Sequence, residues 1–266
     1  MALTYSKIAH KPKIFLRLTG VTVKNFQQII NNVSAGWAKI ESKKKSHGRT
    51  SNLAMLTDKI LALLIYYRTY ILHNSNICRL FKVLEPLLAN KITIKKDKTL
   101  TPEAITKIIA DVTEQPTQRP VKKQKKYYSG KKKRHALKTE IVMNADGKIL
   151  SVSKMSPGKR HDFRMRKEGK PLPGNSEKYV DSGYQGLQKI CTKVNLPFKG
   201  SKKKPLTKEQ KQHNHDLASF RIKVEHKIRK IKVFKILRET YRNFQNKHNL
   251  SFNIIAGIVN LQHGFY

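Results

Sequence analysis

Cysteine is nearly absent from this sequence. The 266 residues contain two cysteines, Cys78 and Cys191, and neither belongs to a CxxC pair. This argues against a cysteine-based zinc site and against a disulfide framework, because both need several cysteines at set spacings. The composition instead fits a protein of the reducing cytosol.

Long hydrophobic runs are missing as well. The longest apolar run, residues 60–67, is far shorter than the ~20 residues that a helix needs to cross a bilayer. Residues 1–11 contain no apolar segment of signal-peptide length. We therefore expect a soluble, cytoplasmic protein with no membrane partner.

Acidic residues are also scarce, whereas basic residues are abundant. Only 17 Asp and Glu accompany 56 Lys and Arg, which gives a formal net charge of +39. A compact protein with this charge repels itself unless a polyanion neutralises it. Because the basic residues are spread along the whole chain and not over one amphipathic helix, nucleic acid is a better candidate partner than a membrane surface.

The N-terminal part of the chain has the spacing of amphipathic helices. Thr22 can cap a first helix, and further helical patterns cover residues 57–72 and 76–89. The polar, basic stretch 42–52 predicts a loop. Three helices in a basic segment predict a small DNA-binding domain of the helix-turn-helix type. The alternative is a plain helical cap on the rest of the chain.

A polar, charged segment at residues 91–101 follows these helices. Thr101-Pro102 can begin a helix there, with proline at its first position. We place a domain boundary in this segment. The prediction is a helical DNA-binding domain at residues 1–95 and a second domain at residues 100–266.

The second domain has the pattern of a mixed sheet flanked by helices, and its predicted class is α/β. Residues 108–113 predict a buried strand, and Asp146-Gly147 joins β-prone runs at 137–144 and 149–155 into a hairpin. A long helical pattern covers residues 207–238. Shorter patterns predict helices at 161–167 and 187–192, a strand at 194–198, and a last helix whose apolar residues lie between 252 and 261.

Three carboxylates of this domain lie in apolar or tightly structured surroundings. Asp111 is inside a predicted strand, Asp181 ends another strand before a glycine-containing turn, and Glu225 flanks the apolar stripe of the long helix, where we expect it to be part-buried. A buried carboxylate needs a partner, because an unpaired charge there is costly. Three such acids could hold two divalent ions ~3.5–4 Å apart, the arrangement that drives in-line attack at phosphodiesters.

Each of these acids also has a purely structural explanation. Asp111 could make a strand-end hydrogen bond, and Asp181 could cap the turn that follows it. Glu225 could form ion pairs with Arg221 and Arg229 at helical spacing.

Two further acids are weaker candidates. Asp162, which follows His161, could cap a helix or lie near the site, so we keep it in reserve. Glu140 has basic neighbours in a predicted strand and looks less central.

The densest basic tract, residues 122–134, lies between two predicted strands. Tyr127 and Tyr128 interrupt it and could stack or pack while the basic side chains meet phosphates. Residues 202–204 form a second basic patch. A basic run can be merely a solvated face, but its place between two strands of one sheet favours a DNA-binding groove. The residues expected to contact DNA here are Lys122, Lys123, Lys125, Lys126, Lys131, Lys132, Lys133 and Arg134.

Four ordered motifs run through the chain. They are DVTE at 111–114 with QRP at 118–120, YYSGKKKRH at 127–135, DSGYQG at 181–186 and RIKVEH at 221–226. Together they resemble bacterial insertion-sequence transposases of the IS-four/IS-five superfamily, which have an RNase H-like DDE catalytic domain behind a helical, helix-turn-helix N-terminal region. The resemblance covers nearly the whole chain.

The resemblance implies a fold, a reaction and residue roles. The fold would be an RNase H-like mixed sheet flanked by helices, in which Asp111, Asp181 and Glu225 form a DDE triad that binds two ions of Mg²⁺ or Mn²⁺. The reaction would be cleavage at transposon ends, followed by attack of the freed 3′-hydroxyl on target DNA, by a homo-oligomer on the bacterial nucleoid. The residues implied to position DNA are Tyr184, Arg229 and Lys232.

One departure from the family pattern concerns the N-terminal region. Members of this group carry another helix between the one ending near Tyr70 and the one starting near Asn76, but only residues 71–75 intervene here. The helix-turn-helix therefore looks shortened, which could abolish recognition of transposon ends. A stand-alone nuclease of the same fold and a non-catalytic, basic DNA-binding protein are the alternatives to a transposase.

Overall fold

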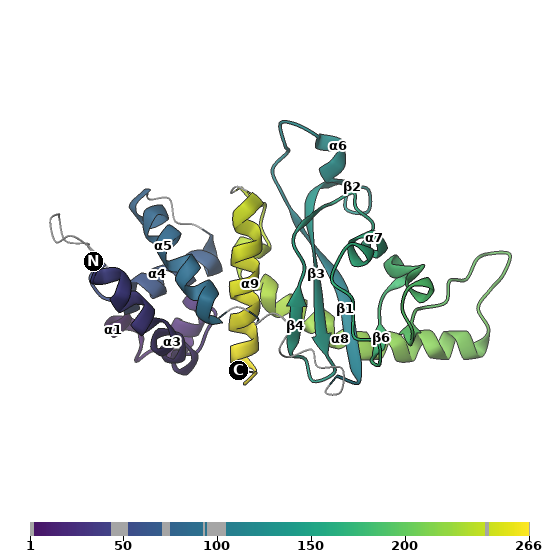
Figure 1. Cartoon of the computed structure of the whole chain (residues 1–266), viewed down its shortest axis with the longest axis horizontal. Helices are drawn as coiled ribbons and strands as arrows, with labels where there is room; N and C mark the ends of the chain where they lie inside the picture. The colour runs from purple at the N-terminus through teal and green to yellow at the C-terminus, as the bar shows by residue number, and fades with distance from the viewer. Residues whose placement is uncertain are drawn as a thin grey trace. The chain divides into compact units, whose positions relative to one another are not determined.

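The structure is a computed structural model that describes residues 3–43, 53–70, 75–92, 94, 105–242 and 245–265, without the side chains of 75–77 and 245–246. The chain divides into two compact units (Figure 1). The first consists of Met1–Thr93, Ile231–Glu239 and Asn243–Tyr266, and the second of Ile94–Lys230 and Thr240–Arg242. The expected boundary at residues 95–100 lies outside the described residues. The C-terminal segments group with the first unit, although we expected all of residues 100–266 in one domain.

The described part of the first unit is helical. Its elements are α1 (Tyr5–Ile8), α2 (Pro12–Thr19), α3 (Val23–Glu41), α4 (Leu56–Thr69), α5 (Ser75–Ile92), η3 (Lys235–Leu237) and α9 (Gln245–Gln262). The three expected N-terminal helices are confirmed, and Thr22 caps α3 by accepting a hydrogen bond from the Asn25 N–H at 3.2 Å. Among the described residues, no helix is long and apolar enough to cross a membrane.

The predicted shortening of the helix-turn-helix falls between α4 and α5. Tyr70 ends α4 in the left-handed conformation, with a φ of 59°, and α5 begins at Ser75. Residues 71–74 lie outside the described residues, as do 44–52 of the expected loop and the expected helix start at Thr101-Pro102. The shortening stays a prediction.

Helices α5 and α9 approach each other closely within the first unit. At Gly257 of α9, an added Cβ would stand 1.7 Å from the carbonyl oxygen of Ile92 and 2.7 Å from its carbonyl carbon. These are backbone atoms, which cannot rotate away as a side chain can. The contact between the two helices therefore requires glycine at this position.

The second unit is a mixed α/β fold. Its sheet has the strand order β2-β3-β1-β6-β7, with β4 and β5 also paired to β3. The strands are β1 (Lys107–Pro116), β2 (Tyr128–Ser129), β3 (Arg134–Asn144), β4 (Ile149–Val152), β5 (Ser156–Pro157), β6 (Glu177–Tyr179) and β7 (Val194–Asn195). The helices are α6 (Gln124–Tyr127), α7 (Asp162–Lys167), η1 (Ser182–Tyr184), η2 (Leu187–Lys189) and α8 (Lys208–Lys232).

Strand β1 is antiparallel to β3 and parallel to β6, and β6 is parallel to β7. This mixed sheet with flanking helices confirms the predicted α/β class and is compatible with an RNase H-like fold. The predicted hairpin between β3 and β4 is confirmed, and Gly147 adopts a positive φ of 88° in its turn. Two elements are shorter than predicted, because the segment 187–192 forms only the three-residue η2 and the segment 194–198 only the two-residue β7.

Residues of β1 alternate between two cores. Ile108 and Ala110 belong to the core cluster that contains Val180 and Tyr184, whereas Ile109 packs with Val224 of α8. Successive side chains of a strand point to opposite faces of the sheet, so even-numbered and odd-numbered residues of β1 face different partners. We call the face that carries Ile108 and Ala110 the inner face, and the face that carries Ile109 the α8 face.

Replacing Gly257 by alanine should destabilise the first unit by about 1–3 kcal/mol or more, because the new methyl group must displace backbone atoms. The matched control is Gly36→Ala in α3, where the added Cβ would meet only the flexible end of the Leu87 side chain, at 2.5 Å. Urea denaturation of the full chain measures both effects. Equal loss of stability in the two variants would show that the α5–α9 contact is looser than described.

Candidate functional site

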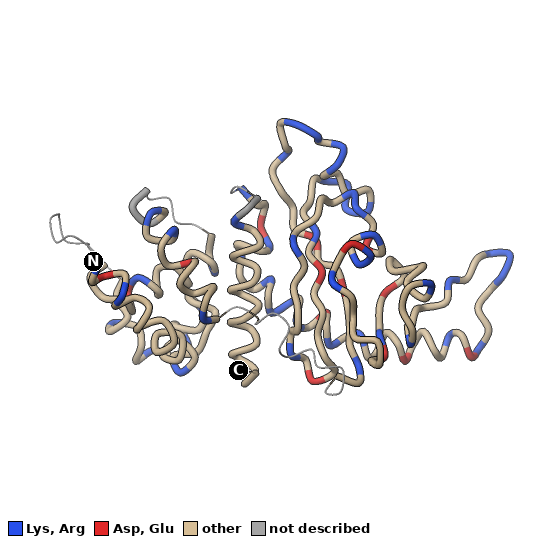
Figure 2. Tube along the Cα trace, in the orientation of Figure 1, with Lys and Arg blue, Asp and Glu red and all other residues tan. Residues whose placement is uncertain are grey.

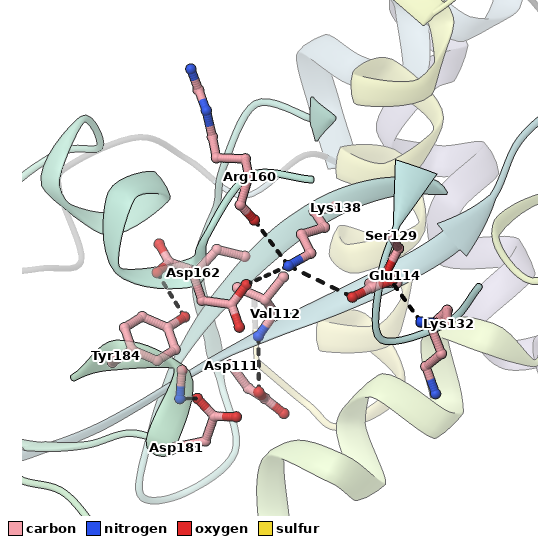
Figure 3. Close-up of polar contacts among 12 residues, drawn as sticks. Asp111, Val112, Glu114, Ser129, Lys132, Lys138, Arg160, Asp162, Asp181 and Tyr184 are labelled. Atoms are coloured by element: carbon pink, nitrogen blue, oxygen red, sulfur yellow. Dashed lines mark hydrogen bonds and ion pairs between the residues drawn. The ribbon is translucent and has the colours of Figure 1, made fainter. Parts of the chain in front are cut away.

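Asp111 and Asp181 come from neighbouring parallel segments of the sheet. The pairing of β1 with β6 ends at Ile109↔Tyr179, and each aspartate lies two residues beyond this pair. Side chains two apart on a strand point the same way, so Asp111 shares the α8 face with Ile109. Asp181 lies just past the end of β6, at the start of the turn η1. Figure 3 shows the two aspartates near each other, with the Asp181 side chain bound to the turn that follows it.

Helix α8 brings a cation and a third carboxylate to this face. Val224 anchors the helix on Ile109. One turn earlier, the Arg221 guanidinium lies 3.5 Å from Asp111 Oδ1. Glu225 follows Arg221 by four residues, so the two side chains lie on the same side of the helix.

The three carboxylates influence one another electrostatically. The pKa of Asp111 is raised to about 6, mainly because the carboxyl group is buried. The Arg221 guanidinium opposes this increase, and the nearby charges of Asp181 and Glu225 contribute to it. The three carboxylates predicted from the sequence therefore lie close enough for Asp181 and Glu225 to influence the charge of Asp111. Whether they carry out catalysis is a separate matter, treated under the proposed function.

The exposure of Glu225 differs from our prediction. We expected this residue to be part-buried, but it is exposed. The buried residue is its neighbour Val224, and consecutive residues of a helix are rotated by about 100° from one another. The side chain of Glu225 therefore lies at the edge of the contact between helix and sheet.

The donor set fits a hard divalent cation by its charge and chemistry. Carboxylate oxygens are the ligands that Mg²⁺ prefers, and a cation would offset the burial and the nearby negative charges that raise the pKa of Asp111. The carboxylates are not yet gathered around one point, however. Among the described residues, no group of three or more His, Cys, Asp or Glu side chains is arranged closely enough to hold a metal ion.

Acids on the inner face of the sheet have cations of their own. Lys138 Nζ lies 2.9 Å from Asp162 Oδ1, 3.6 Å from Glu114 Oε1 and 3.0 Å from the Arg160 carbonyl oxygen (Figure 3). The reserve candidate Asp162 is thus neutralised by a lysine. By contrast, among the described residues Asp111 has only the Arg221 guanidinium near it as a cation, at 3.5 Å, while two further acids add negative charge.

Glu140, which looked less central in the sequence, is the most deeply placed acid of this inner face. It is 3% exposed. Its Oε2 accepts a hydrogen bond from Arg166 Nη1 at 2.7 Å, and its Oε1 accepts one from the Tyr184 hydroxyl at 2.9 Å. Burial raises the pKa of Glu140, and the Arg166 charge opposes this increase. The alternation of charged and apolar residues in β3 was the available signal, but it does not identify Arg166 as the partner.

The residues predicted to contact DNA are in contrasting surroundings. All eight basic residues named in the tract 122–134 are exposed, and Figure 2 shows them around α6 and the turn after β2. Arg229 is exposed and Lys232 is half-buried. Tyr184 differs from the expectation, because its ring is fully buried in the inner core and its hydroxyl is bound to Glu140. This placement gives Tyr184 a structural contact where we expected one with DNA.

Comparisons with known proteins identify the family of this chain. A family profile described as DDE superfamily endonuclease matches residues 110–260. The chain belongs to this superfamily of endonucleases.

A relative from Microchaete diplosiphon makes the relationship more specific. It is described as a probable transposase for insertion sequence element IS702, and it is 36% identical over 263 residues, covering 93% of this chain and 94% of its own length. The resemblance to insertion-sequence transposases is confirmed. A comparison with solved structures gave no match.

Replacing Asp111 by asparagine should stabilise the metal-free protein at neutral pH. The pKa of Asp111 rises from 3.8 to about 6 on folding, so between these values the folded state binds more protons and loses stability as the pH rises. The variant should gain on the order of 1–3 kcal/mol at pH 7, and the gain should shrink as the pH falls from about 6 to about 4, where the Asp111 carboxyl takes up a proton in the folded state.

Urea denaturation at several pH values in the presence of a chelator measures this effect. The control is Asp146→Asn, which removes an exposed carboxylate from the β3–β4 turn. A pH-independent difference between Asp111→Asn and the unmodified chain would show that Asp111 is not strained by its neighbours.

Proposed function

We propose that this chain is a DNA transposase that cuts DNA at the ends of a mobile element and joins the freed 3′-hydroxyl to target DNA. Asp111, Asp181 and Glu225 are the catalytic carboxylates and hold two divalent ions, Mg²⁺ or Mn²⁺. The observation that supports the proposal is the electrostatic influence of Asp181 and Glu225 on the buried Asp111 in a chain of the DDE endonuclease superfamily. Because two element ends must be joined to one target, the chain acts as a homo-oligomer on DNA.

The residues of the site have separate roles. Bound divalent ions supply an activated oxygen nucleophile and stabilisation of the leaving oxygen. Asp111 and Asp181 provide oxygen ligands from the sheet, and Glu225 provides one from the exposed edge of α8, where DNA can approach. Arg221 holds Asp111 in place from 3.5 Å and keeps part of its negative charge balanced before metal arrives.

Two basic surfaces bind the DNA backbone. The first is the tract 122–134, and the second is the arm formed by residues 198–214, which extends from the sheet to the N-terminal part of α8 (Figures 1 and 2). Phosphate contacts from exposed Lys and Arg dominate DNA affinity and do not depend on sequence. Both surfaces therefore position DNA and do not select a sequence.

The arm is ordered by its own polar contacts. Asn214 binds the backbone of Phe198 twice, at 2.8 Å from its N–H and 3.0 Å from its carbonyl oxygen. Thr207 and Gln210 bind each other's backbone N–H groups in a reciprocal cap of α8. Lysines 202–204 therefore lie in a loop whose two ends are fixed by hydrogen bonds.

A non-catalytic DNA-binding role is the second candidate. It is favoured by the absence, among the described residues, of a ready-made group of three metal ligands. Under this alternative, the basic surfaces bind DNA but the carboxylates never gather around an ion.

Strand cleavage tests the proposal directly. DNA that carries the element's own ends should be nicked in the presence of Mg²⁺, and a chelator should abolish nicking. Asp181→Asn and Glu225→Gln should reduce cleavage and joining to the level seen without metal, because each removes an oxygen ligand. Asp216→Asn, which changes an exposed acid of α8 outside the arm 198–214, is the matched control and should retain activity.

The products distinguish the candidates. Cleaved and joined DNA supports a transposase, and cleavage without joining identifies a stand-alone nuclease. DNA binding without cleavage supports the non-catalytic role. Full activity of Asp181→Asn would show that Asp181 is neither a catalytic residue nor a metal ligand.

Salt dependence tests the DNA-binding surfaces. Each lost phosphate contact lowers the slope of log affinity against log salt by about 0.9, so Lys131→Ala with Lys132→Ala should lower the slope by roughly 2. The control is Lys154→Ala with Lys167→Ala, which removes the same charge from exposed positions outside the tract. An unchanged slope in the first double variant, or a flat salt dependence of the unmodified chain, would contradict a DNA-binding tract at 122–134.

A further inference from the structure

Asp181 depends on a very short turn for its position. Strand β6 ends at Tyr179, and Asp181 caps the three-residue helix η1, accepting a hydrogen bond from the Gly183 N–H at 2.8 Å. The Tyr184 N–H donates back to the Asp181 carbonyl oxygen at 3.2 Å. One turn of this kind has little stability of its own, so other contacts must fix it.

Tyr184 supplies the main anchor of that turn. It is the buried residue of η1 and is fully enclosed in the inner core. Its hydroxyl donates to Glu140 Oε1 at 2.9 Å. The position of the turn is therefore coupled to the position of one buried carboxylate on β3.

Glu140 is itself held from two directions. Arg166 of α7 binds its other oxygen at 2.7 Å and also donates to the Lys170 carbonyl oxygen. Along the strand, Glu140 lies opposite Val112 of β1, and the neighbouring register pair is Asp111↔Ile141. The β1–β3 ladder therefore connects Glu140 directly to the backbone that carries Asp111.

Helix α7 also limits movement of the turn. An added Cβ at Gly183 would stand 2.6 Å from Asp162 Oδ2 and 3.0 Å from Asp181 Oδ1. Lys138 holds Asp162 in this position at 2.9 Å. The turn thus has no room to shift toward α7.

From these contacts we infer that Glu140, Tyr184 and Arg166 are positioning residues that fix the separation of the Asp111 and Asp181 carboxylates. Asp111 is connected to Glu140 through the strand ladder, and Asp181 through η1 and the Tyr184 hydroxyl. The inference rests on the proposed function, in which both aspartates bind metal. Removing a group that orients a metal ligand in this way typically weakens metal binding.

Mn²⁺ binding by the full chain, measured without DNA by electron paramagnetic resonance and calorimetry, tests the inference. Tyr184→Phe removes the hydroxyl and keeps the ring, so it should weaken Mn²⁺ binding by about 10-fold. The control is Leu150→Val, which removes one methylene group from the same core cluster. The control should lower the thermal unfolding midpoint without changing Mn²⁺ affinity.

Asp181→Asn distinguishes a failure of the proposed metal site from a failure of the positioning role. If it leaves Mn²⁺ binding intact, the proposed metal site is wrong and the positioning role falls with it. If it removes binding while Tyr184→Phe binds Mn²⁺ as tightly as the unmodified chain, the positioning role alone is overturned.

Arg166→Lys covers the case in which Tyr184→Phe does not fold. Lysine keeps the positive charge beside Glu140 but loses the fixed two-pronged geometry of the guanidinium. This variant should fold and should bind Mn²⁺ at least several-fold more weakly than the unmodified chain, because Glu140 would no longer be held in a fixed position. Unchanged Mn²⁺ affinity in folded Arg166→Lys would overturn the inference.

Discussion

A buried carboxylate needs a positive charge nearby, and the two faces of this sheet meet that need differently. On the inner face, Lys138 lies 2.9 Å from Asp162, and Arg166 lies 2.7 Å from Glu140. On the α8 face, Arg221 approaches Asp111 only to 3.5 Å, while two further acids add negative charge. The acids of the inner face therefore have close cationic partners within the chain, whereas beside α8 one more distant arginine faces three acids.

Strand geometry decides which face each acid of β1 and β3 lies on. Strands β1 and β3 contribute to both faces, because neighbouring residues such as Glu140 and Ile141 point in opposite directions. A slip of one residue in the pairing would move Asp111 into the inner core and Val112 toward α8. The apolar residues on each side of Asp111 thus fix the register, and through the register they fix which acids face α8.

The helices and strands that carry the site could be predicted from the sequence more reliably than the burial of its individual residues. Asp111 could be placed on a buried strand, and the glycines after Asp181 indicated the turn that it caps, because both signals are local. The exposure of Glu225 could not be predicted, since it depends on how α8 is rotated on the sheet. Glu140 looked peripheral because its partners, Arg166 and Tyr184, are 26 and 44 residues away along the chain.

The same limit applies to the C-terminal helix. Its apolar pattern predicted an amphipathic helix, and α9 confirms it, but the pattern says nothing about which unit the helix joins. That choice is decided by contacts such as the approach of Gly257 to the backbone of Ile92. A glycine in the middle of a helix ordinarily weakens it, so its presence is informative only once the neighbouring helix is known.

The scarcity of acids affects the surface as well as the site. Several of the 17 carboxylates are held inside the second unit, among them Glu140 at 3% exposure. Lys138 and Arg166 are matched to such interior acids, but the eight basic residues of the tract 122–134 are all exposed. Asp162 and Glu140 do not neutralise that tract, because Lys138 and Arg166 already pair with them at close range. The surface therefore keeps an uncompensated positive charge, which is why a polyanion such as DNA is the partner that the chain's electrostatics favour most strongly.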